Sequence, residues 1–156
     1  MAKGKKDKAK SPGSIQIKNK KAYRDYELIE KIEAGMALKG TEVKSLRNAH
    51  ADLDGSYAKL VRNECYLVGA NISPYENAGY AANHEIGRDR KLLLHKRQIL
   101  KIRHRLEQKG FTIIPLRIYF NDRGLAKIEL AVARGKKKYD KREKLTKREH
   151  TKEIKF

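Results

Sequence analysis

The chain has 156 residues, a length that fits one domain with extensions, and its 38 Lys and Arg against 19 Asp and Glu give a net charge of +19. Such an excess of cations favours nucleic acid as a partner, ahead of an anionic membrane or an acidic protein. No stretch approaches the roughly 20 apolar residues of a membrane span, and the basic N-terminal residues lack the apolar segment of a secretory signal. The single cysteine, Cys65, favours a reducing, cytoplasmic location.

The positive charge is concentrated in three segments. Residues 1–21 hold eight Lys and one Asp, residues 87–109 hold nine bases and two acids, and residues 135–156 hold ten bases and four acids. The remainder is close to neutral. We therefore expect specific basic binding surfaces rather than the non-specific binding of a uniformly basic protein.

The first predicted elements are an arm and a long strand. Residues 1–17 are expected to be a solvated basic arm, disordered on its own, because this Lys-rich stretch is broken by Pro12 and Gly13. From Tyr26 to Leu38, apolar residues fall on alternate positions, which predicts a strand with one buried side. Gly40 ends it.

A short helix and a hairpin are expected next. The helix reaches Arg47, with Thr41 as its N-cap and Glu42 in its first turn. The apolar runs 57–61 and 65–72, separated by a polar turn, predict two paired strands.

A long loop, a basic helix and a last hairpin complete the chain order. Residues 73–90 are too many for a simple connection, and long loops are often functional. Within residues 87–109, apolar positions recur at helical spacing, and the helix is expected to end at Gly110. The stripe consists of His95, Ile99, Ile102 and Leu106. Residues 111–120 and 125–133 predict the final two strands.

This order of elements predicts a mostly β protein, a closed antiparallel barrel with an OB-like core and peripheral helices, because closure of the sheet removes exposed edges. Three regions are expected. They are the basic arm of residues 1–17, the barrel of residues 18–134, and the basic tail of residues 135–156, which is too polar to order by itself.

No combination of residues predicts catalysis. His84 and Glu85 lack the second His of a zinc-binding helix, and no glycine-rich phosphate loop is present. Cys65 lies in an expected strand, where a small core residue is more common than a nucleophile. We expect no enzyme activity, no cofactor and no metal.

Basic and polar residues are the candidates for RNA contact, each with an ordinary alternative. The bases from Arg88 to Arg105 favour phosphate contact, although a charged helix is often only a solvated face. From this segment the candidates are Lys91, Lys96 and Arg97. Lys20 and Lys21 can contact phosphate or merely keep the chain soluble.

Three further side chains can contact nucleobases. Asn19 donates and accepts hydrogen bonds at once, which suits a base edge. Glu33 can accept from base amino groups, or it is a solvent-facing strand carboxylate. Tyr139 is a lone tail aromatic or a stacking platform.

Several segments together carry a family resemblance: NKKAYRDYELIEKIEAGMALKGTEVKSLR, GSYAKL, GANISPYENA, RDRKLLLHKRQI and ARGKKKYDKR. In this order and spacing they resemble small protein B, the family of SsrA-binding proteins that partner transfer-messenger RNA in bacteria. The resemblance implies a barrel with an OB-like core. It also implies that family positions used in RNA binding are occupied here by Asn19, Lys20, Glu33, Leu93 and Lys127.

The resemblance implies a role in trans-translation. Family members bind the tRNA-like domain of transfer-messenger RNA and stand in place of its missing anticodon arm, while elongation factor Tu with GTP carries the assembly to a stalled ribosome. The tail stretch is implied to enter the small subunit at the decoding site and to become helical in the empty mRNA channel. It comprises Gly135, Lys136, Lys137, Lys138, Tyr139, Asp140, Lys141 and Arg142.

Two other classes compete with this interpretation. A structural ribosomal RNA-binding protein can also combine basic arms with a small barrel. A nuclease or RNA-modifying enzyme is the third alternative, and it requires RNA to be changed covalently.

Overall fold

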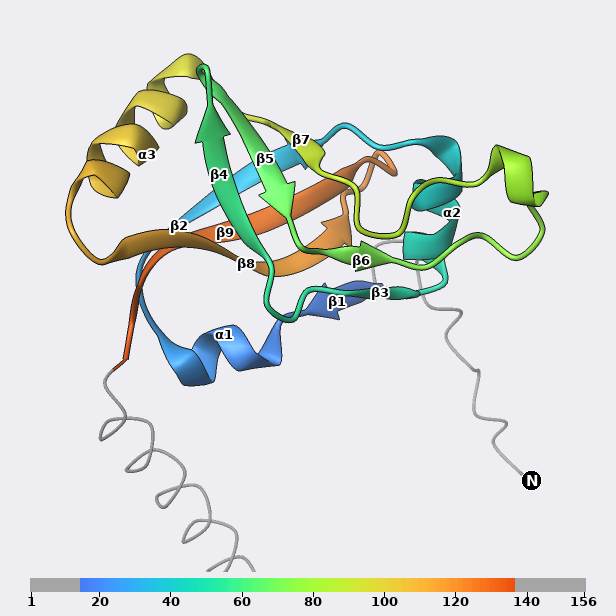
Figure 1. The fold of residues 1–156 in the computed structure, drawn as a ribbon, viewed down its shortest axis with the longest axis horizontal. Helices are drawn as coiled ribbons and strands as arrows, with labels where there is room; N and C mark the ends of the chain where they lie inside the picture. The colour runs from blue at the N-terminus through green and yellow to red at the C-terminus, as the bar shows by residue number, and fades with distance from the viewer. Residues whose placement is uncertain (1–14, 137–156) are drawn as a thin grey trace, which may run out of the picture.

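Antiparallel strands dominate residues 15–136, which are the residues that the computed structural model describes (Figure 1). The main sheet contains β1 (Gln16–Lys18), β2 (Tyr26–Met36), β4 (Tyr57–Val61), β5 (Glu64–Val68), β7 (Arg90–Leu93), β8 (Phe111–Phe120) and β9 (Ala126–Gly135). A small second sheet pairs β3 (Ala51–Asp52) with β6 (Asn71–Ile72). The helices are α1 (Lys20–Asp25), α2 (Gly40–Arg47), α3 (Lys96–Glu107) and the 3-10 turn η2 (Tyr80–Ala82).

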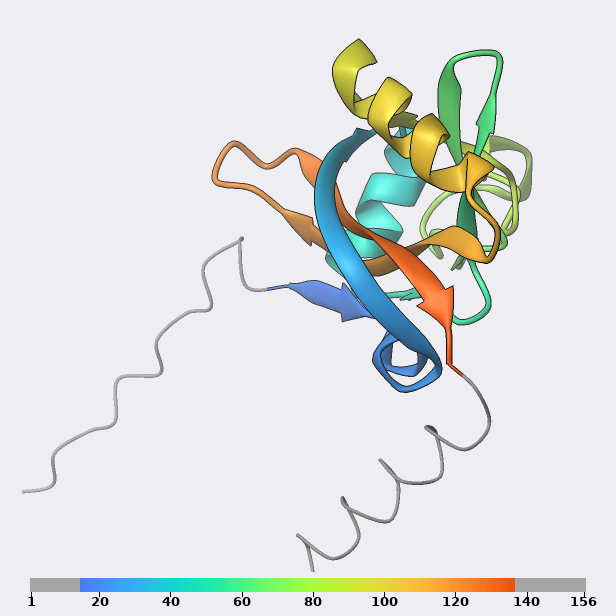
Figure 2. The same cartoon turned by 90° about the vertical axis from the view of Figure 1, so that its left-hand side faces the viewer.

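The pairing of the main sheet is antiparallel throughout. It runs from β8 to β4, β5, β7, β2 and β9, and β9 pairs with β8 again. The strand β1 also pairs with β8, at Arg117–Tyr119, whereas β4 pairs with it at Ile113. The mostly β class with few helices and the last predicted hairpin are confirmed. In the first predicted hairpin β4 pairs with β5, but the strand expected over 65–72 is divided into β5 and β6, which belong to different sheets. Figure 2 shows β2 and β9 side by side across the body, with α1 at one end of them and α3 near the other.

Two bulges divide the buried side chains into two layers. In β2 the register shifts between Leu28 and Glu30, and in β8 it shifts between Pro115 and Arg117. Pro115 fits such a site because it has no amide hydrogen to give to a regular ladder. An extra residue at a bulge reverses which side chains point inward.

The larger layer fills the interior of the strand cycle, and the smaller one lies between the sheet and α1. The larger contains Ile32, Ala34, Met36, Leu67, Ile102, Ile113, Ile118 and Leu130 among others. The smaller consists of Ala22, Ile114, Leu116, Ala131 and Ala133, with Tyr26 and Leu28 packed against it. The single buried side predicted for residues 26–38 therefore holds only beyond the bulge.

The folded body extends past both predicted boundaries. Ile17, assigned to the arm, is buried in β1, which pairs with β8. Gly135, assigned to the tail, belongs to β9, and the Lys136 amide donates to the Asp25 carbonyl over 3.0 Å. The three-residue strand β1 leaves no readable period, so sequence alone could not place the start of the body. The expectations for residues 1–14 and 137–156 lie outside the described residues.

The predicted basic segment 87–109 contains two elements rather than one helix. Its first part is β7, and α3 begins only at Lys96, after His95. Arg88 and Arg90 precede the helix and point inward to the carboxylate of Glu42, at 2.7 Å and 2.8 Å. Arg90 and Glu42 are fully buried. These two arginines are therefore structural, because a buried carboxylate requires paired charge.

Candidate nucleic-acid interface

Strand register places three of the predicted residues on one surface. Lys127 of β9 lies opposite Gly35 of β2, and Gly35 lies opposite Leu93 of β7. Glu33 is two residues before Gly35 and so shares its side of the sheet. We call this surface the open sheet face, and it comprises Lys31, Glu33, Leu93, Arg117, Tyr119, Lys127 and Glu129.

Charges on the open sheet face are arranged in a connected network. Glu129 forms ion pairs with Arg117 and, at 3.5 Å, with Lys31. Burial raises the pKa of Glu129, but hydrogen bonding and charge from Arg117, together with Lys31, hold it below its usual value. The Arg117 guanidinium lies 4.7 Å from the centre of the Tyr119 ring.

Tyr119 and Glu33 interact across β9. The Tyr119 hydroxyl donates to the Glu33 carboxylate. Burial, followed by this hydrogen bond, raises the pKa of Tyr119 to about 12, so the hydroxyl keeps its proton. Lys127 forms no ion pair with any acid in the described part of the chain. It is therefore the cation that this surface can offer to a phosphate.

Asn19 has a structural position rather than the exposed one expected of a base-contacting amide. It is buried, its Oδ1 accepts from the Ala22 amide as the N-cap of α1, and its Nδ2 donates to the Pro115 carbonyl over 3.0 Å. The cap fixes the start of α1, and the second bond ties it to the β8 bulge. Asn19 thus positions the exposed Lys20 and Lys21.

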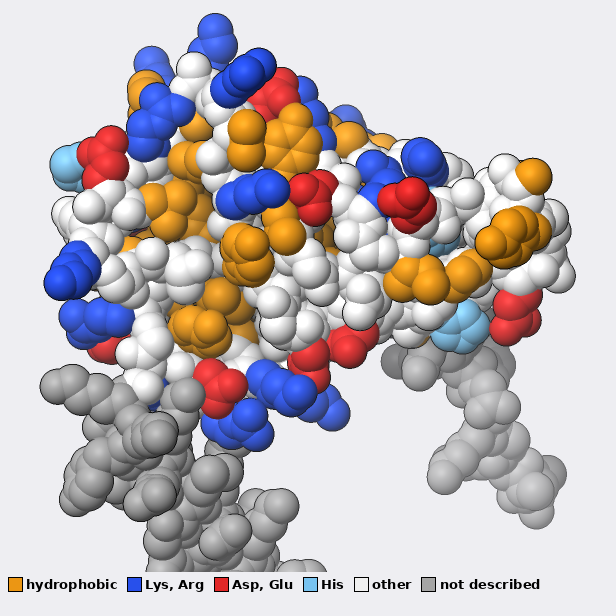
Figure 3. Space-filling view, in the orientation of Figure 1, with side chains coloured by type: hydrophobic (Ala, Val, Ile, Leu, Met, Phe, Trp, Pro, Cys, Tyr) orange, Lys and Arg blue, Asp and Glu red, His pale blue; other side chains and the backbone are white. Residues whose placement is uncertain are grey.

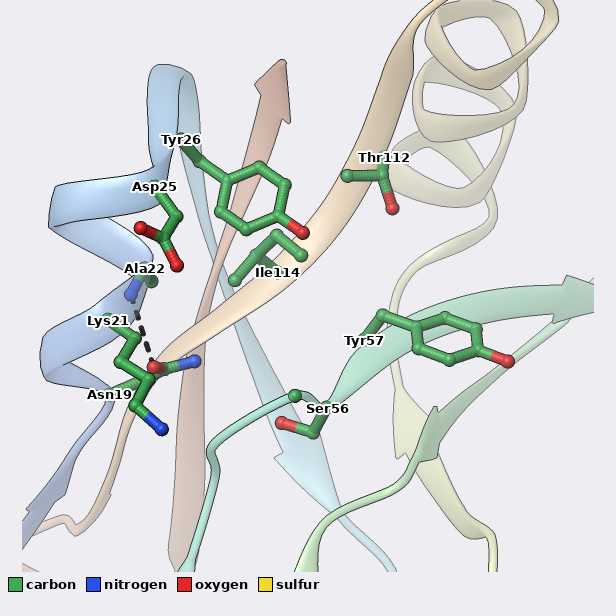
Figure 4. Close-up of a pocket in the computed structure, with 10 residues that line it drawn as sticks. Asn19, Lys21, Ala22, Asp25, Tyr26, Ser56, Tyr57, Thr112 and Ile114 are labelled. Carbon is green, nitrogen blue, oxygen red and sulfur yellow. Dashed lines mark hydrogen bonds between the residues drawn. The ribbon is translucent and has the colours of Figure 1, made fainter. Parts of the chain in front are cut away.

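A cavity of about 350 Å³ lies beside α1 (Figure 4). Figure 4 shows Tyr26 and Ser56 on opposite sides of it, with Lys21 and Asn19 along one edge. Lys21 forms an ion pair with Asp54 at 2.7 Å, which raises the pKa of the lysine through the hydrogen bond and the charge. An aromatic ring, hydroxyls and a cation around one hollow are groups that can hold a nucleotide.

The third candidate region lies where β7 meets α3. Lys96 and Arg97 are exposed and form no ion pair with the described acids, whereas Lys91 pairs with Glu64 at 2.7 Å. Leu93 is 54% exposed and lines a groove together with His95 and with Ile99 of α3. Leu93 therefore links this region to the open sheet face, while α1 lies away from α3 (Figure 1).

Two of the predicted tail residues can be placed. Gly135 ends β9, and the Lys136 ammonium donates to the Tyr23 carbonyl of α1 over 3.1 Å. The other six, Lys137, Lys138, Tyr139, Asp140, Lys141 and Arg142, lie outside the described residues. Sequence reasoning missed Arg117, Tyr119 and Glu129, although their alternation with Ile118 and Ile128 could have placed them on the open sheet face.

The described residues contain no arrangement typical of a catalytic centre. Cys65 is fully buried, and burial raises the pKa of its thiol to about 11, which keeps it protonated. His84 is buried with both ring nitrogens hydrogen-bonded, to Thr41 and to the Ile72 carbonyl. Within residues 15–136, His, Cys, Asp and Glu form no group of three that could hold a metal. No helix there is long and apolar enough to cross a bilayer.

Fold and site together define a small, mostly β protein whose surface presents cations beside aromatic rings. The model of the SmpB protein family matches residues 16–156. The SsrA-binding protein of Thermosipho africanus is 50% identical over 136 residues, covering 87% of this chain and 91% of that protein. The SsrA-binding protein of Thermus thermophilus is 52% identical over 126 residues, covering 81% and 87%.

A solved structure described as "tmRNA-SmpB: a journey to the center of the bacterial ribosome" contains a chain of similar fold. It superposes with a TM-score of 0.68 at 48% identity, and the match covers 83% of this chain and 94% of that one. The chain belongs to the SmpB protein family.

Proposed function

We propose that this protein is an RNA-binding adaptor of trans-translation that binds the tRNA-like domain of transfer-messenger RNA, or SsrA. The observation that carries the proposal is the convergence of Glu33, Leu93 and Lys127 on the open sheet face, through the pairing of β9 with β2 and of β2 with β7. Family membership supports it, because the relatives are SsrA-binding proteins.

The chemistry of the open sheet face fits folded RNA. Lys127 supplies a cation for phosphate, Glu33 accepts from base amino groups, and Leu93 offers an apolar surface to a ribose or a base. Phosphate contacts fix position, while the carboxylate and the apolar contact discriminate between surfaces of the RNA. Lys96 and Arg97 on α3 extend the same phosphate-binding area.

A closed OB-like barrel is the scaffold that we propose for this surface. Its support is the cycle of strand pairs that starts and ends at β8. A closed sheet leaves few edges to aggregate and holds strand residues in fixed register, so residues remote in sequence keep their spacing.

Delivery to the ribosome is the remaining part of the proposal. The RNA-bound protein takes the place of the missing anticodon arm, and elongation factor Tu with GTP brings the assembly to a stalled ribosome. The tail beyond Lys136 then enters the empty mRNA channel near the decoding site. This process uses binding alone and asks for no catalytic residue or cofactor.

The first experiment measures affinity for the tRNA-like domain. Lys127→Ala should weaken binding roughly tenfold and reduce the salt dependence by about one counterion. Arg123→Ala, in the exposed β8–β9 turn, is the matched control and should bind as the wild type does. Equal losses in both variants would indicate a diffuse charge effect and would contradict the assigned surface.

The second experiment separates RNA binding from action on the ribosome. Truncation after Lys136 keeps β9 and its contacts with α1 intact, so binding to the tRNA-like domain should remain while tagging on stalled ribosomes is lost. Loss of both activities would favour the structural ribosomal protein. Covalent change of the RNA by the purified protein would instead favour an enzyme.

A further inference from the structure

The loop between β6 and β7 differs from the rest of this basic chain. Residues 73–87, which we call the projecting loop, contain no Lys or Arg and two acids, Glu76 and Glu85. In Figure 1 the loop extends from the body at the end opposite α3. Tyr80 in η2 is fully exposed. In Figure 3 this end shows apolar and acidic groups rather than dense cation cover.

The base of the projecting loop is firmly attached to the body. His84 bonds to Thr41 at 2.8 Å and to the Ile72 carbonyl at 2.9 Å. The Arg90 guanidinium donates to the Ile86 carbonyl at 2.9 Å while it pairs with Glu42. Because His84 and Arg90 are buried, the base of the loop cannot detach from the body without breaking several hydrogen bonds at once.

The outer part of the loop is held by its own side chains. Asn83 accepts from the Tyr75 amide at 2.9 Å and donates to the Tyr75 carbonyl at 3.0 Å, which closes the loop on itself. The Lys44 ammonium lies 5.1 Å from the centre of the Tyr75 ring. Tyr80 is therefore presented on an ordered support, so contact with a partner costs little ordering entropy.

The two arginines next to the loop are paired, whereas Lys44 is exposed. Arg88 and Arg90 neutralise Glu42, while the Lys44 ammonium lies over the Tyr75 ring and forms no ion pair with the described acids. Glu76 and Glu85 are also exposed and form no ion pair with the described bases. Phosphates would meet two carboxylates here, which the single lysine Lys44 does not outweigh, and this disfavours RNA.

We propose that the projecting loop is a docking surface for a basic protein segment, with Tyr80 stacking on an arginine or lysine and Glu76 and Glu85 pairing with neighbouring cations. An aromatic ring beside carboxylates is complementary to such a segment. This part of the inference rests on the proposed function. The partner is then a basic protein of the stalled ribosome, which the projecting loop contacts while α3 and the open sheet face bind RNA.

A crosslinking experiment tests the occupant directly. Tyr80→p-benzoylphenylalanine is introduced into the full chain, which is bound to transfer-messenger RNA and stalled ribosomes and then irradiated. The crosslink should go to protein, and adding Glu76→Lys with Glu85→Lys should lower its yield about three- to tenfold. A crosslink to RNA, or none in a complex that still sediments with the ribosome, would overturn the proposal. The same photoreactive residue placed at Tyr57, on β4, is the control that shows whether the crosslink depends on its position in the projecting loop.

A second measurement does not depend on the ribosome. Titration of the purified protein with a peptide of alternating Arg and Gly should shift the amide resonances of residues 75–85, and Glu76→Gln with Glu85→Gln should remove the shifts. Absent shifts, or shifts spread over other acidic positions, would overturn the docking surface. Failure of the proposed function alone would appear as lost binding to the tRNA-like domain with these shifts retained.

Discussion

Gly35 of β2 and Leu93 of β7 lie opposite each other so closely that a Cβ on Gly35 would come within 3.3 Å of the Leu93 Cβ. Gly35 also lies opposite Lys127, so it sits between two of the residues proposed to bind RNA. Glycine at this point lets Leu93 lie against the strand. The spacing of the open sheet face therefore depends on a missing side chain.

Substitution of Gly35 should change both stability and RNA binding. Gly35→Val should destabilise the fold by about 1–3 kcal/mol and weaken binding to the tRNA-like domain, because Leu93 must move outward. Gly35→Ala should have a smaller effect in the same direction. Urea unfolding and filter binding measure the two quantities. Gly79→Ala, where a Cβ meets nothing within 4 Å, is the control. Unchanged affinity in the valine variant would contradict the role of this spacing.

Removal of the Asn19 side chain should loosen α1. Asn19→Ala deletes the N-cap and leaves the buried Pro115 carbonyl without its amide donor, so a loss of about 2–4 kcal/mol in the free energy of unfolding is expected. RNA affinity should fall as Lys20 and Lys21 lose their support. Asn77→Ala, an exposed amide, should change stability by less than about 0.5 kcal/mol. Equal effects of the two variants would show that the amide does not hold α1.

The buried Glu42 carboxylate predicts how the free energy of unfolding changes at acidic pH. Burial raises its pKa, but the hydrogen bonds from Arg88, the Lys39 amide and Arg90 outweigh this and lower it below the ordinary 4.5. The unfolded chain therefore binds this proton first as the pH falls. The stabilisation is complete above pH 4.5 and is lost as the pH drops through the lower folded-state value.

Glu42→Gln should remove this part of the acid sensitivity. At neutral pH it should also cost about 3–5 kcal/mol, because Arg90 stays buried without a compensating charge. Denaturant unfolding at pH 7, 5 and 4 measures both effects. Glu64→Gln, which breaks the exposed pair with Lys91, is the control and should change little. A stable Glu42→Gln variant would show that the carboxylate is dispensable.

Cys65 should not react in the folded protein. Its side chain is fully buried, and burial raises its pKa to about 11. Modification by a thiol reagent at pH 8 should be at least about a hundredfold slower than in the unfolded chain. Its rate should follow global unfolding as denaturant is added. Rapid labelling without unfolding would reveal an opening of β5.

The long strands and the long helix could be predicted from sequence because the spacing of their apolar residues is unambiguous. Alternation in residues 111–120 and 126–133 and the apolar stripe through Ile102 identified the last hairpin and α3. Sequence reasoning missed α1, because KKAYRD has no apolar stripe, and the only local signal was the N-cap Asn19. It also could not separate β7 from α3, since a four-residue strand beside a helix shares the same run of bases.

The candidate site was predicted in composition but not in arrangement. Glu33, Leu93 and Lys127 were named from the family resemblance, yet only strand register shows that they share one surface. Arg88 and Arg90 were assigned to an exposed basic helix because sequence does not reveal a buried carboxylate 46 and 48 residues away. The buried position of Asn19 was not predicted for a similar reason, because its partners on Pro115 and Leu53 are remote in sequence.

Lys136, the last residue that the structure describes, is held to α1 by two contacts. Its amide and its ammonium are fastened to the carbonyls of Asp25 and Tyr23, the last turn of the same six-residue helix that carries Lys20. Because both contacts are made to the last turn of α1, any displacement of this helix would also displace Lys136.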